Sequence, residues 1–319
     1  MLESLLKDAG LNNPVEDGIV TRIDDKYSLV RNIDIFTPLV DDGYVQGKIA
    51  ACNVTNDIFA NNVRTVQGFL AFIGVPTDMP MEIARDILKG MDDFARGIGT
   101  RVLGGHTIHN QWPLAGGEAA GIEETAKLVH KRGMKPGDVL FLTKPLGTQP
   151  LLAAYRVFAD QDDVLNELDE AEIRKGITHA ITVMTTSNKA VVDAIHSCDP
   201  IPVRAMSDVT GFGLWGTLKQ IADQSESVAA IIDKIVALPQ AFAVANVFGY
   251  NTEQGKSAET AGGMLMAVKQ DRVAELQDAL VKYRVPHWQV GRVEKKSGTS
   301  EVRLAKHVEL VTTEYTGTL

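Results

Sequence analysis

The chain has few of the residues that mark several common protein classes. Its two cysteines, Cys52 and Cys198, lie far apart, so the sequence predicts neither a disulfide framework nor a zinc cluster, and the reducing cytoplasm is the simplest setting. No apolar run approaches the length of a membrane span, and the first residues lack the layout of a signal peptide. The net charge of −9 argues against a nucleic-acid or anionic-membrane surface. We therefore expect a cytoplasmic protein that acts on a small molecule, with no nucleic-acid or membrane partner.

The common nucleotide-binding signatures are also missing, since neither a P-loop nor a GxGxxG pattern occurs. The 319 residues contain strand-like and helix-like segments in both halves, enough for two α/β domains. A polar stretch with two glycines and a proline covers 131–138. We place the boundary there, with an N-terminal domain at 1–133 and a C-terminal domain at 134–319, and expect the site to lie between them.

Hydrophobic periodicity predicts the elements of each half. In the first half we expect strands at 27–36, 65–75 and 115–122, helices at 44–61 and 80–97, and a short strand at 101–103 that runs into a glycine turn. In the second half we expect a strand at 139–143, others near 203, 229, 262, 288 and 301, and helices at 150–160, 170–197, 212–223, 239–248 and 271–283.

The tract from Met206 to Gly213 is the most informative motif. Asp208 follows a short apolar strand, and Gly211 opens a predicted helix that carries Phe212, Trp215 and Leu218 toward a core. Such a turn can hold a metal beside a phosphate at a helix N-terminus. An aspartate that caps its own helix is an equally good interpretation of this tract alone.

Acidic residues recur at the ends of apolar segments: Asp17, Asp34, Asp57 and Asp208. Carboxylates are the hard oxygen ligands that suit magnesium. Asp34 lies inside an apolar strand, where a lone carboxylate is costly to bury. Asn53, Asn56 and Asp57 share one helix face; we favour a functional role for this polar stripe over a solvated face, because asparagine is a poor helix former.

Two glycine-rich tracts offer backbone amides. Gly104-Gly105-His106-Thr107 can bind phosphate or be an ordinary tight turn, and the same alternatives hold for Glu259 to Gly263. We do not assign His106 as a general base. Cys52 is expected to pack in a core rather than act as a nucleophile.

Taken in order along the chain, these segments resemble the selenophosphate synthetase (selenide, water dikinase) family, in the superfamily that includes aminoimidazole ribonucleotide synthetase. The resemblance spans roughly residues 15 to 295 and rests on six tracts: Asp34 to Asp41, Gly47 to Ala60, Gly104 to Ile108, Leu142 to Gly147, Met206 to Gly213 and Glu259 to Leu265.

The resemblance implies a site and an assembly. Asp17, Asp57 and Asp208 match magnesium-binding aspartates, and Asp34 matches an aspartate near the phosphates of ATP. Asn53 and the loop residues Gly104, Gly105, His106 and Thr107 would line those phosphates. The implied fold has two α/β domains with mixed sheets, and the N-terminal domains of two subunits pair into a β-barrel-like homodimer.

The resemblance also implies an activity, although the sequence departs from the family pattern, above all near its start. The family carries a cysteine or selenocysteine, then Gly-Cys-Lys, before its first metal aspartate; the sixteen residues before Asp17 hold no cysteine and one lysine, Lys7, so no catalytic residue is assigned. The activity expected is a magnesium-dependent phosphotransfer that turns ATP, selenide and water into selenophosphate, AMP and phosphate. Alternatives are a catalytically reduced nucleotide-binding or regulatory homologue, or transfer to another acceptor such as sulfide or a purine-pathway metabolite.

Overall fold

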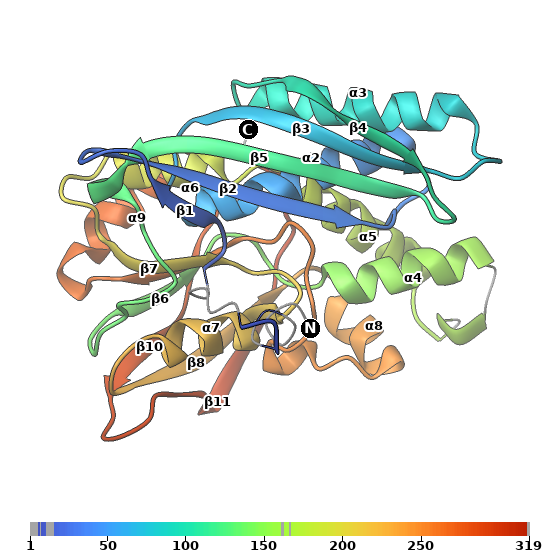
Figure 1. The fold of residues 1–319 in the computed structure, drawn as a ribbon. Coiled ribbons are helices and arrows are strands. Elements are labelled where there is room, and N and C mark those ends of the chain that lie inside the picture. The colour runs from blue at the N-terminus through green and yellow to red at the C-terminus, as the bar shows by residue number, and fades with distance from the viewer. Residues whose placement is uncertain (1–5, 7, 11–15, 161–162, 166, 318–319) are drawn as a thin grey trace.

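The frame of the protein is a pair of mixed β-sheets, one in each half of the chain, with helices between and around them (Figure 1). The computed structural model describes residues 6, 8–10, 16–160, 163–165 and 167–317, and Lys7 lies outside this range. The mixed α/β class expected from the sequence is confirmed.

The first sheet has five strands in the order β1-β2-β5-β3-β4, antiparallel except for the parallel pair β3 and β4. Helices α2 and α3 pack against each other and against this sheet. These elements are β1 (Ile19–Arg22), β2 (Tyr27–Phe36), α2 (Gly43–Ala60), β3 (Val66–Val75), α3 (Met81–Gly97), β4 (Val102–His109), β5 (Leu114–Glu124) and the 3-10 turn η1 (Thr125–Lys127).

The glycine turn expected at 104–107 is not a turn. Strand β4 continues to His109, because its backbone pairs in parallel with β3, with Gly105 opposite Ala71. Gly105 has φ +154°, and a Cβ there would lie 1.9 Å from the carbonyl oxygen of Ala71. Close approach of two strands therefore explains this glycine.

The second sheet has six strands in the order β11-β8-β10-β6-β9-β7, antiparallel except for β11 beside β8. Its strands are β6 (Val139–Leu142), β7 (Val203–Asp208), β8 (Val228–Ala237), β9 (Met264–Val268), β10 (Trp288–Lys295) and β11 (Glu301–Thr312). Its helices are α4 (Thr148–Asp160), α5 (Glu170–Thr185), α6 (Lys189–His196), α7 (Gly213–Asp223), α8 (Ala241–Phe248) and α9 (Val273–Lys282), with 3-10 turns η2 (Asp163–Leu165), η3 (Thr252–Gln254) and η4 (Gln270–Arg272).

The single helix expected at 170–197 is two helices, α5 and α6, separated at Thr186 to Asn188. The buried ammonium of Lys144 donates to the carbonyls of Val183 and Thr186, at 3.1 and 2.6 Å. These carbonyls at the end of α5 are thus satisfied by a side chain from β6 and its following turn, which stabilises the helix end.

The helix after Asp208 begins at Gly213 rather than at Gly211. Phe212, expected in the core, is 62% exposed, whereas Leu218 is buried. The start of α7 is displaced because Gly213 has φ +63°, which lets the chain turn closely over the backbone of Ser257.

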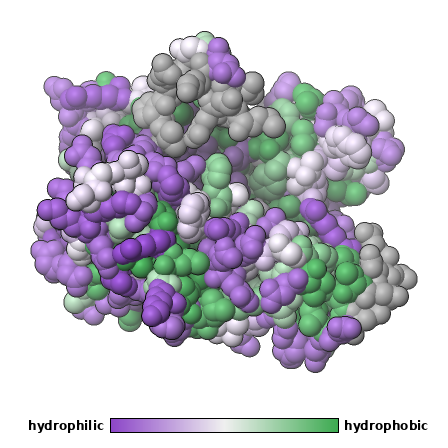
Figure 2. All heavy atoms as spheres, turned by 90° about the horizontal axis from the view of Figure 1, so that it is seen from below, coloured by the Kyte–Doolittle hydropathy of each residue, from purple (hydrophilic) through white to green (hydrophobic). Residues whose placement is uncertain are grey.

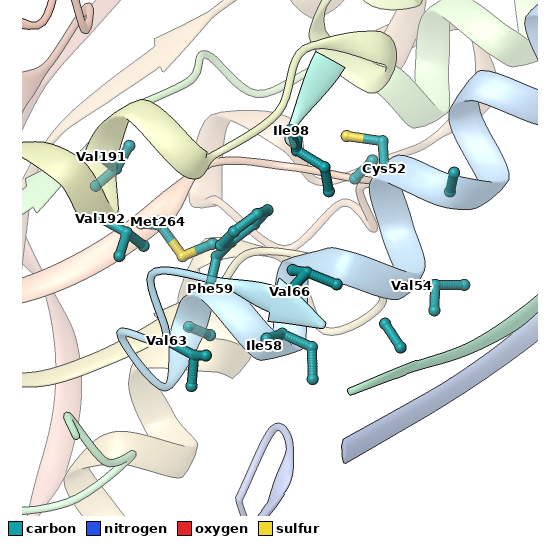
Figure 3. Packing of buried hydrophobic residues seen from close by; sticks show 14 of the residues in the cluster. Cys52, Val54, Ile58, Phe59, Val63, Val66, Ile98, Val191, Val192 and Met264 are labelled. Carbon is teal, nitrogen blue, oxygen red and sulfur yellow. The ribbon is translucent and has the colours of Figure 1, made fainter. Parts of the chain in front are cut away.

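One core cluster spans both halves of the chain. Phe59 of α2 lies beside Val191 and Val192 of α6 and Met264 of β9, as Figure 3 shows. Cys52 is buried in the same cluster and carries a free thiol, as expected for a packing residue. Helix α2 is therefore held from two sides, by the first sheet and by the second half, which fixes its polar stripe in place.

Away from the helices, the outer face of the first sheet exposes apolar side chains, among them Ile33, Leu70, Leu103 and Ile122, around the ion pair of Arg31 with Glu118. Strands β1 and β4 are its edges, so the strands described here form an open sheet and no closed barrel. The underside of the molecule, formed by the second half, is instead a mosaic of polar and apolar side chains (Figure 2). None of the helices described is both long and apolar enough to cross a membrane.

Candidate functional site

Asp17, Asp57 and Asp208 meet at one place. Asp17 precedes β1, Asp57 lies in the last turns of α2, and Asp208 ends β7. One carboxylate oxygen from each falls within 4.8 Å of the others. The fold thus brings together three acidic residues that are as much as 191 positions apart in the sequence.

Asp208 is buried at the end of β7 and does not cap α7, whose N-cap residue is Phe212. The next backbone amide, of Val209, donates to the carbonyl of Gly263 at 2.9 Å. A Cβ on Gly262 would lie 2.0 Å from the carbonyl oxygen of Val209. The glycine turn at 208–213 and the one at 259–263, called the first and second glycine turns below, therefore pack against each other. Together they form one wall beside the carboxylates.

The crowding of carboxylates disfavours their charged forms. Burial, followed by the charges of Asp208 and Asp17, raises the pKa of Asp57 well above its usual range. Burial and then the charge of Asp17 raise the pKa of Asp208 to about 7. Such a cluster needs positive charge nearby to hold more than one carboxylate ionised.

Lys131 supplies positive charge to this cluster. Its ammonium pairs with Oδ1 of Asp17, and the two side chains are 8% and 5% exposed. Burial alone would lower the pKa of Lys131, but the negative charge of Asp17 raises it. Asp208 and Asp57 add to this effect, so the net result is a raised pKa. Ser207 donates a further hydrogen bond to the same Asp17 oxygen at 3.0 Å, and the second oxygen, Oδ2, is buried and has no hydrogen-bond partner among the described residues.

Asp34 lies beside the cluster on β2. Its Oδ2 accepts from the amides of Asn32 and Asn53, at 3.0 and 3.2 Å. Burial raises the pKa of this carboxyl despite the two hydrogen bonds. Asn53 also accepts from the backbone amide of Ala261 at 2.9 Å, so it joins Asp34 to the second glycine turn.

The polar stripe on α2 is not a solvated face. Asn56 is buried and donates to the carbonyl of Gly262 at 3.2 Å, while its side-chain oxygen accepts from Asn188. The stripe therefore connects α2 to the second half and aims Asn53 and Asp57 at the cavity beside it.

That cavity has a volume of about 360 Å³. Asp34, Asn53, Asp57 and Asp208 line it together, with Thr210, Gly211, Glu259 and Thr260 of the two glycine turns. A larger groove, of about 770 Å³, is lined by His130 and Arg132 but by none of the four aspartates. The carboxylates, rather than volume, therefore identify the smaller cavity as the candidate site.

The tract from Gly104 to Thr107 does not line the cavity. It is exposed on the edge strand β4, whereas Asp34 lies on β2. Strands β5 and β3 stand between them, which corresponds to roughly 14 Å across the sheet. Binding of phosphate by this tract stays a prediction, and within one chain its four residues lie outside the lining of the cavity.

Two site residues were not anticipated from the sequence. Lys131 stands in a run of charged residues that is typical of an exposed linker, so nothing local indicates its burial. Glu259 opens a glycine turn that was recognised, yet its role depends on contacts with Gly147 and Thr148, more than a hundred positions away. An acidic residue three positions before a glycine pair was the signal that the sequence offered for it.

The chemistry of the donors suits a hard cation. The three aspartates offer oxygen ligands alone, and Oδ2 of Asp17 is a buried acceptor that no residue of the described part of the chain satisfies. Magnesium prefers such oxygen donors and commonly shares them with phosphate and water. The residues present therefore fit a divalent cation held beside a nucleotide.

Comparison with known proteins agrees with this geometry. The chain matches the N-terminal domain of AIR synthase related proteins over residues 15–122 and the C-terminal domain over 135–303. It is 39% identical to the selenide, water dikinase of Methanocaldococcus jannaschii, covering 89% of this chain and 81% of the relative. It is 37% identical to the protein of the same name in Methanococcus maripaludis, covering 89% and 85%.

The fold is shared more widely. Thiamine monophosphate kinase from Aquifex aeolicus superposes with a TM-score of 0.70 at 16% identity, covering 94% of this chain and 95% of that one. The fold alone therefore does not select the substrate. The two matched domains and the identity to the archaeal relatives show that the chain belongs to the selenide, water dikinase family of AIR synthase related proteins.

Proposed function

We propose that the chain is an ATP-using phosphotransferase of the selenophosphate synthetase type, which turns ATP, selenide and water into selenophosphate, AMP and phosphate. The observation that carries the proposal is the meeting of Asp17, Asp57 and Asp208 beside a cavity walled by two glycine turns. The names of the archaeal relatives, selenide, water dikinase, support selenide as the acceptor.

Magnesium is part of the proposal. Asp17, Asp57 and Asp208 would hold it, because they offer converging oxygen ligands in a site with an unsatisfied carboxylate oxygen. When bound, the ion supplies positive charge that offsets the charge of the phosphates during transfer. The pKa of about 7 at Asp208 means that the ligand set is more fully ionised at neutral and higher pH.

The remaining residues of the cavity position the nucleotide. The side-chain nitrogen of Asn53 donates to Asp34, and its side-chain oxygen accepts from the backbone amide of Ala261. These two hydrogen bonds fix the spacing between two walls of the cavity. Thr210 and Thr260 also line the cavity, and their hydroxyls would donate to phosphate oxygens. Positioning and charge compensation are the main contributions a protein makes to phosphoryl transfer.

We also propose that the protein is a homodimer that pairs through the outer face of the first sheet. An exposed apolar face made by Ile33, Leu70, Leu103 and Ile122 favours association with a second copy. Two such open sheets, face to face, would make the β-barrel-like dimer expected from the sequence. Pairing would also bring Gly104, Gly105, His106 and Thr107 of one subunit toward the cavity of the other, which explains how an exposed edge could bind ATP.

Two organisational expectations accompany this function. The division into domains at 1–133 and 134–319 is supported by the family matches, 15–122 and 135–303, which fall on either side of it. A cytoplasmic location is supported by the free thiols of Cys52 and Cys198.

The experiment is phosphorus NMR of ATP with magnesium, with and without selenide under reducing conditions. We expect a selenophosphate signal, together with AMP and phosphate, only in the sample that contains selenide. ATP that stays intact with selenide, sulfide and formylglycinamidine ribonucleotide, yet binds to the protein, would instead identify a regulatory nucleotide-binding homologue. A product with sulfide or the purine metabolite alone would reassign the acceptor.

A matched pair of variants keeps the experiment specific. Asp208→Asn should abolish product formation. Asp193→Asn, on α6 in ion pairs with Arg64 and Lys189 and outside the cavity, should leave it unchanged.

A further inference from the structure

Lys131 is held in an unusual position for a lysine in a linker. Its backbone amide donates to Glu16 at 3.1 Å, which anchors the segment beside the residues that precede β1. Its ammonium pairs with Asp17 and donates to Oε1 of Gln220 on α7 at 3.2 Å. Backbone and side chain together direct a positive charge into the three-aspartate cluster.

The cluster needs such a charge. Three carboxylates with oxygens within 4.8 Å of one another repel strongly when buried, and an uncompensated buried charge is costly. Lys131 compensates only part of this, because it pairs with one oxygen of Asp17 and leaves Oδ2 without a partner. The ammonium of Lys131 and a divalent cation would therefore compete for the carboxylate of Asp17.

We propose that the ammonium of Lys131 is the resident cation of the three-aspartate cluster when no metal is bound, and that a divalent ion must displace it from Asp17 to bind. This inference rests on the proposed function, since it takes the cluster as the metal site. Displacement costs least when the incoming ion brings anionic phosphates, which give the ammonium a new partner. Lys131 thus couples metal binding to nucleotide binding and keeps the empty site from taking up divalent ions by itself.

The test measures binding of manganese, a paramagnetic substitute for magnesium, by electron paramagnetic resonance without nucleotide. Lys131→Met keeps the aliphatic stem and removes the charge. We expect this variant to bind manganese at least about tenfold more tightly than the wild type. Lys131→Arg keeps the charge and should stay within about threefold of the wild type. Lys127→Met, at an exposed lysine paired with Glu124, is the matched control and should change nothing.

Equal or weaker manganese binding by Lys131→Met than by the wild type would overturn the inference. A double-mutant cycle covers the case in which that variant folds poorly. Asp17→Asn and Asp17→Asn/Lys131→Met should bind manganese with affinities within about threefold of each other, because the lysine no longer competes for a carboxylate. A larger difference between these two variants would contradict the competition.

The proposed function is judged by separate measurements. Wild-type protein that neither binds manganese with ATP nor forms product with selenide refutes the proposed function. The comparison of Lys131→Met with the wild type in the absence of nucleotide still decides whether Lys131 competes for the cluster.

Discussion

The hydroxyl of Thr148 donates to Oε2 of Glu259 at 2.5 Å, and the backbone amide of Thr148 donates to the same oxygen at 2.8 Å. The amide of Gly147 donates to the other oxygen, Oε1, at 2.8 Å. Glu259 therefore acts as a cap for the start of α4 from a distant part of the chain. Because Glu259 also lines the cavity, this cap fixes one cavity wall to the second sheet.

The first prediction concerns the stability of this contact as a function of pH. Burial raises the pKa of Glu259 to about 7 from 4.5, despite its hydrogen bonds to Thr148 and Gly147. Between these values the folded state holds a proton that the unfolded state releases, so this group makes stability fall as pH rises, until about pH 7. Glu259→Gln removes that slope, so from pH 5 to pH 8 we expect its stability relative to the wild type to rise by up to about 3 kcal/mol, on top of a constant loss where its NH2 faces a donor of Gly147 or Thr148. Urea unfolding at pH 5 to 8 measures the difference.

The control is Glu275→Gln. A hydrogen bond from Arg272 lowers the pKa of the exposed Glu275, so this group titrates below the window and should add no slope between pH 5 and 8. A Glu259→Gln variant whose stability follows the wild type in parallel across the window would show that Glu259 is ionised throughout.

The second prediction concerns the buried lysine between the halves. Lys144 donates to the carbonyls of Val183, Thr186 and Ala261, and so joins the end of α5 to the second glycine turn. Lys144→Met leaves these acceptors without their donor, and we expect a loss of about 3 kcal/mol in the free energy of unfolding. Lys175→Met, at an exposed lysine on α5, should cost less than about 0.5 kcal/mol. Equal losses in the two variants would contradict a structural role for Lys144.

Local patterns were enough to predict most elements. The strand at 27–36 and the helix at 44–61 correspond to β2 and α2 within one residue at each end. The errors occur where distant contacts decide: β4 extends through 104–107 because it pairs with β3, and the helix at 170–197 breaks where Lys144 binds the end of α5.

In the candidate site, too, local patterns could be predicted and distant contacts could not. The convergence of Asp17, Asp57 and Asp208 was expected because the resemblance supplied their common role, and the polar stripe on α2 predicted a function for Asn53. Lys131 could not be predicted, since its burial depends on how the linker passes β7, where His130 bridges to Ala205. The spacing of residues along the sequence does not indicate such a contact between distant segments.

The third prediction separates activity from stability at the cluster. Asp57 has a pKa well above its usual range because it is buried beside Asp208 and Asp17. Asp57→Asn removes one carboxylate from that group, so we expect the metal-free protein to gain about 1 kcal/mol or more in stability. The same variant should lose at least about 100-fold in turnover with magnesium and ATP. Thermal unfolding without metal and phosphorus NMR with ATP test the two parts, and a destabilised variant with normal turnover would contradict both.

The fourth prediction concerns the outer face of the first sheet. Ile33 of β2 is 66% exposed in one chain, as is Val281 of α9, which lies in the other half. If the sheets pair, Ile33→Asp buries a charge at the interface and should weaken the dimer at least about tenfold, whereas Val281→Asp should not. Sedimentation equilibrium measures both variants. A wild-type protein that is monomeric at micromolar concentration would contradict the dimer directly.

The last prediction asks whether the two subunits share a site. His106 lies on β4, outside the cavity that Asp57 lines, and two strands separate β4 from the strand β2 that carries Asp34. In the proposed dimer, His106 of one subunit would serve the nucleotide held at Asp57 of the other. His106→Ala and Asp57→Asn homodimers should each have little activity. After mixing and subunit exchange in equal amounts, half of the dimers are mixed, and each mixed dimer contains one site with both native residues. Activity should then recover to about a quarter of the wild type. No recovery, with subunit exchange shown by mass spectrometry, would contradict a site shared between the subunits. Full activity of the His106→Ala homodimer would remove the exposed edge of β4 from the ATP site.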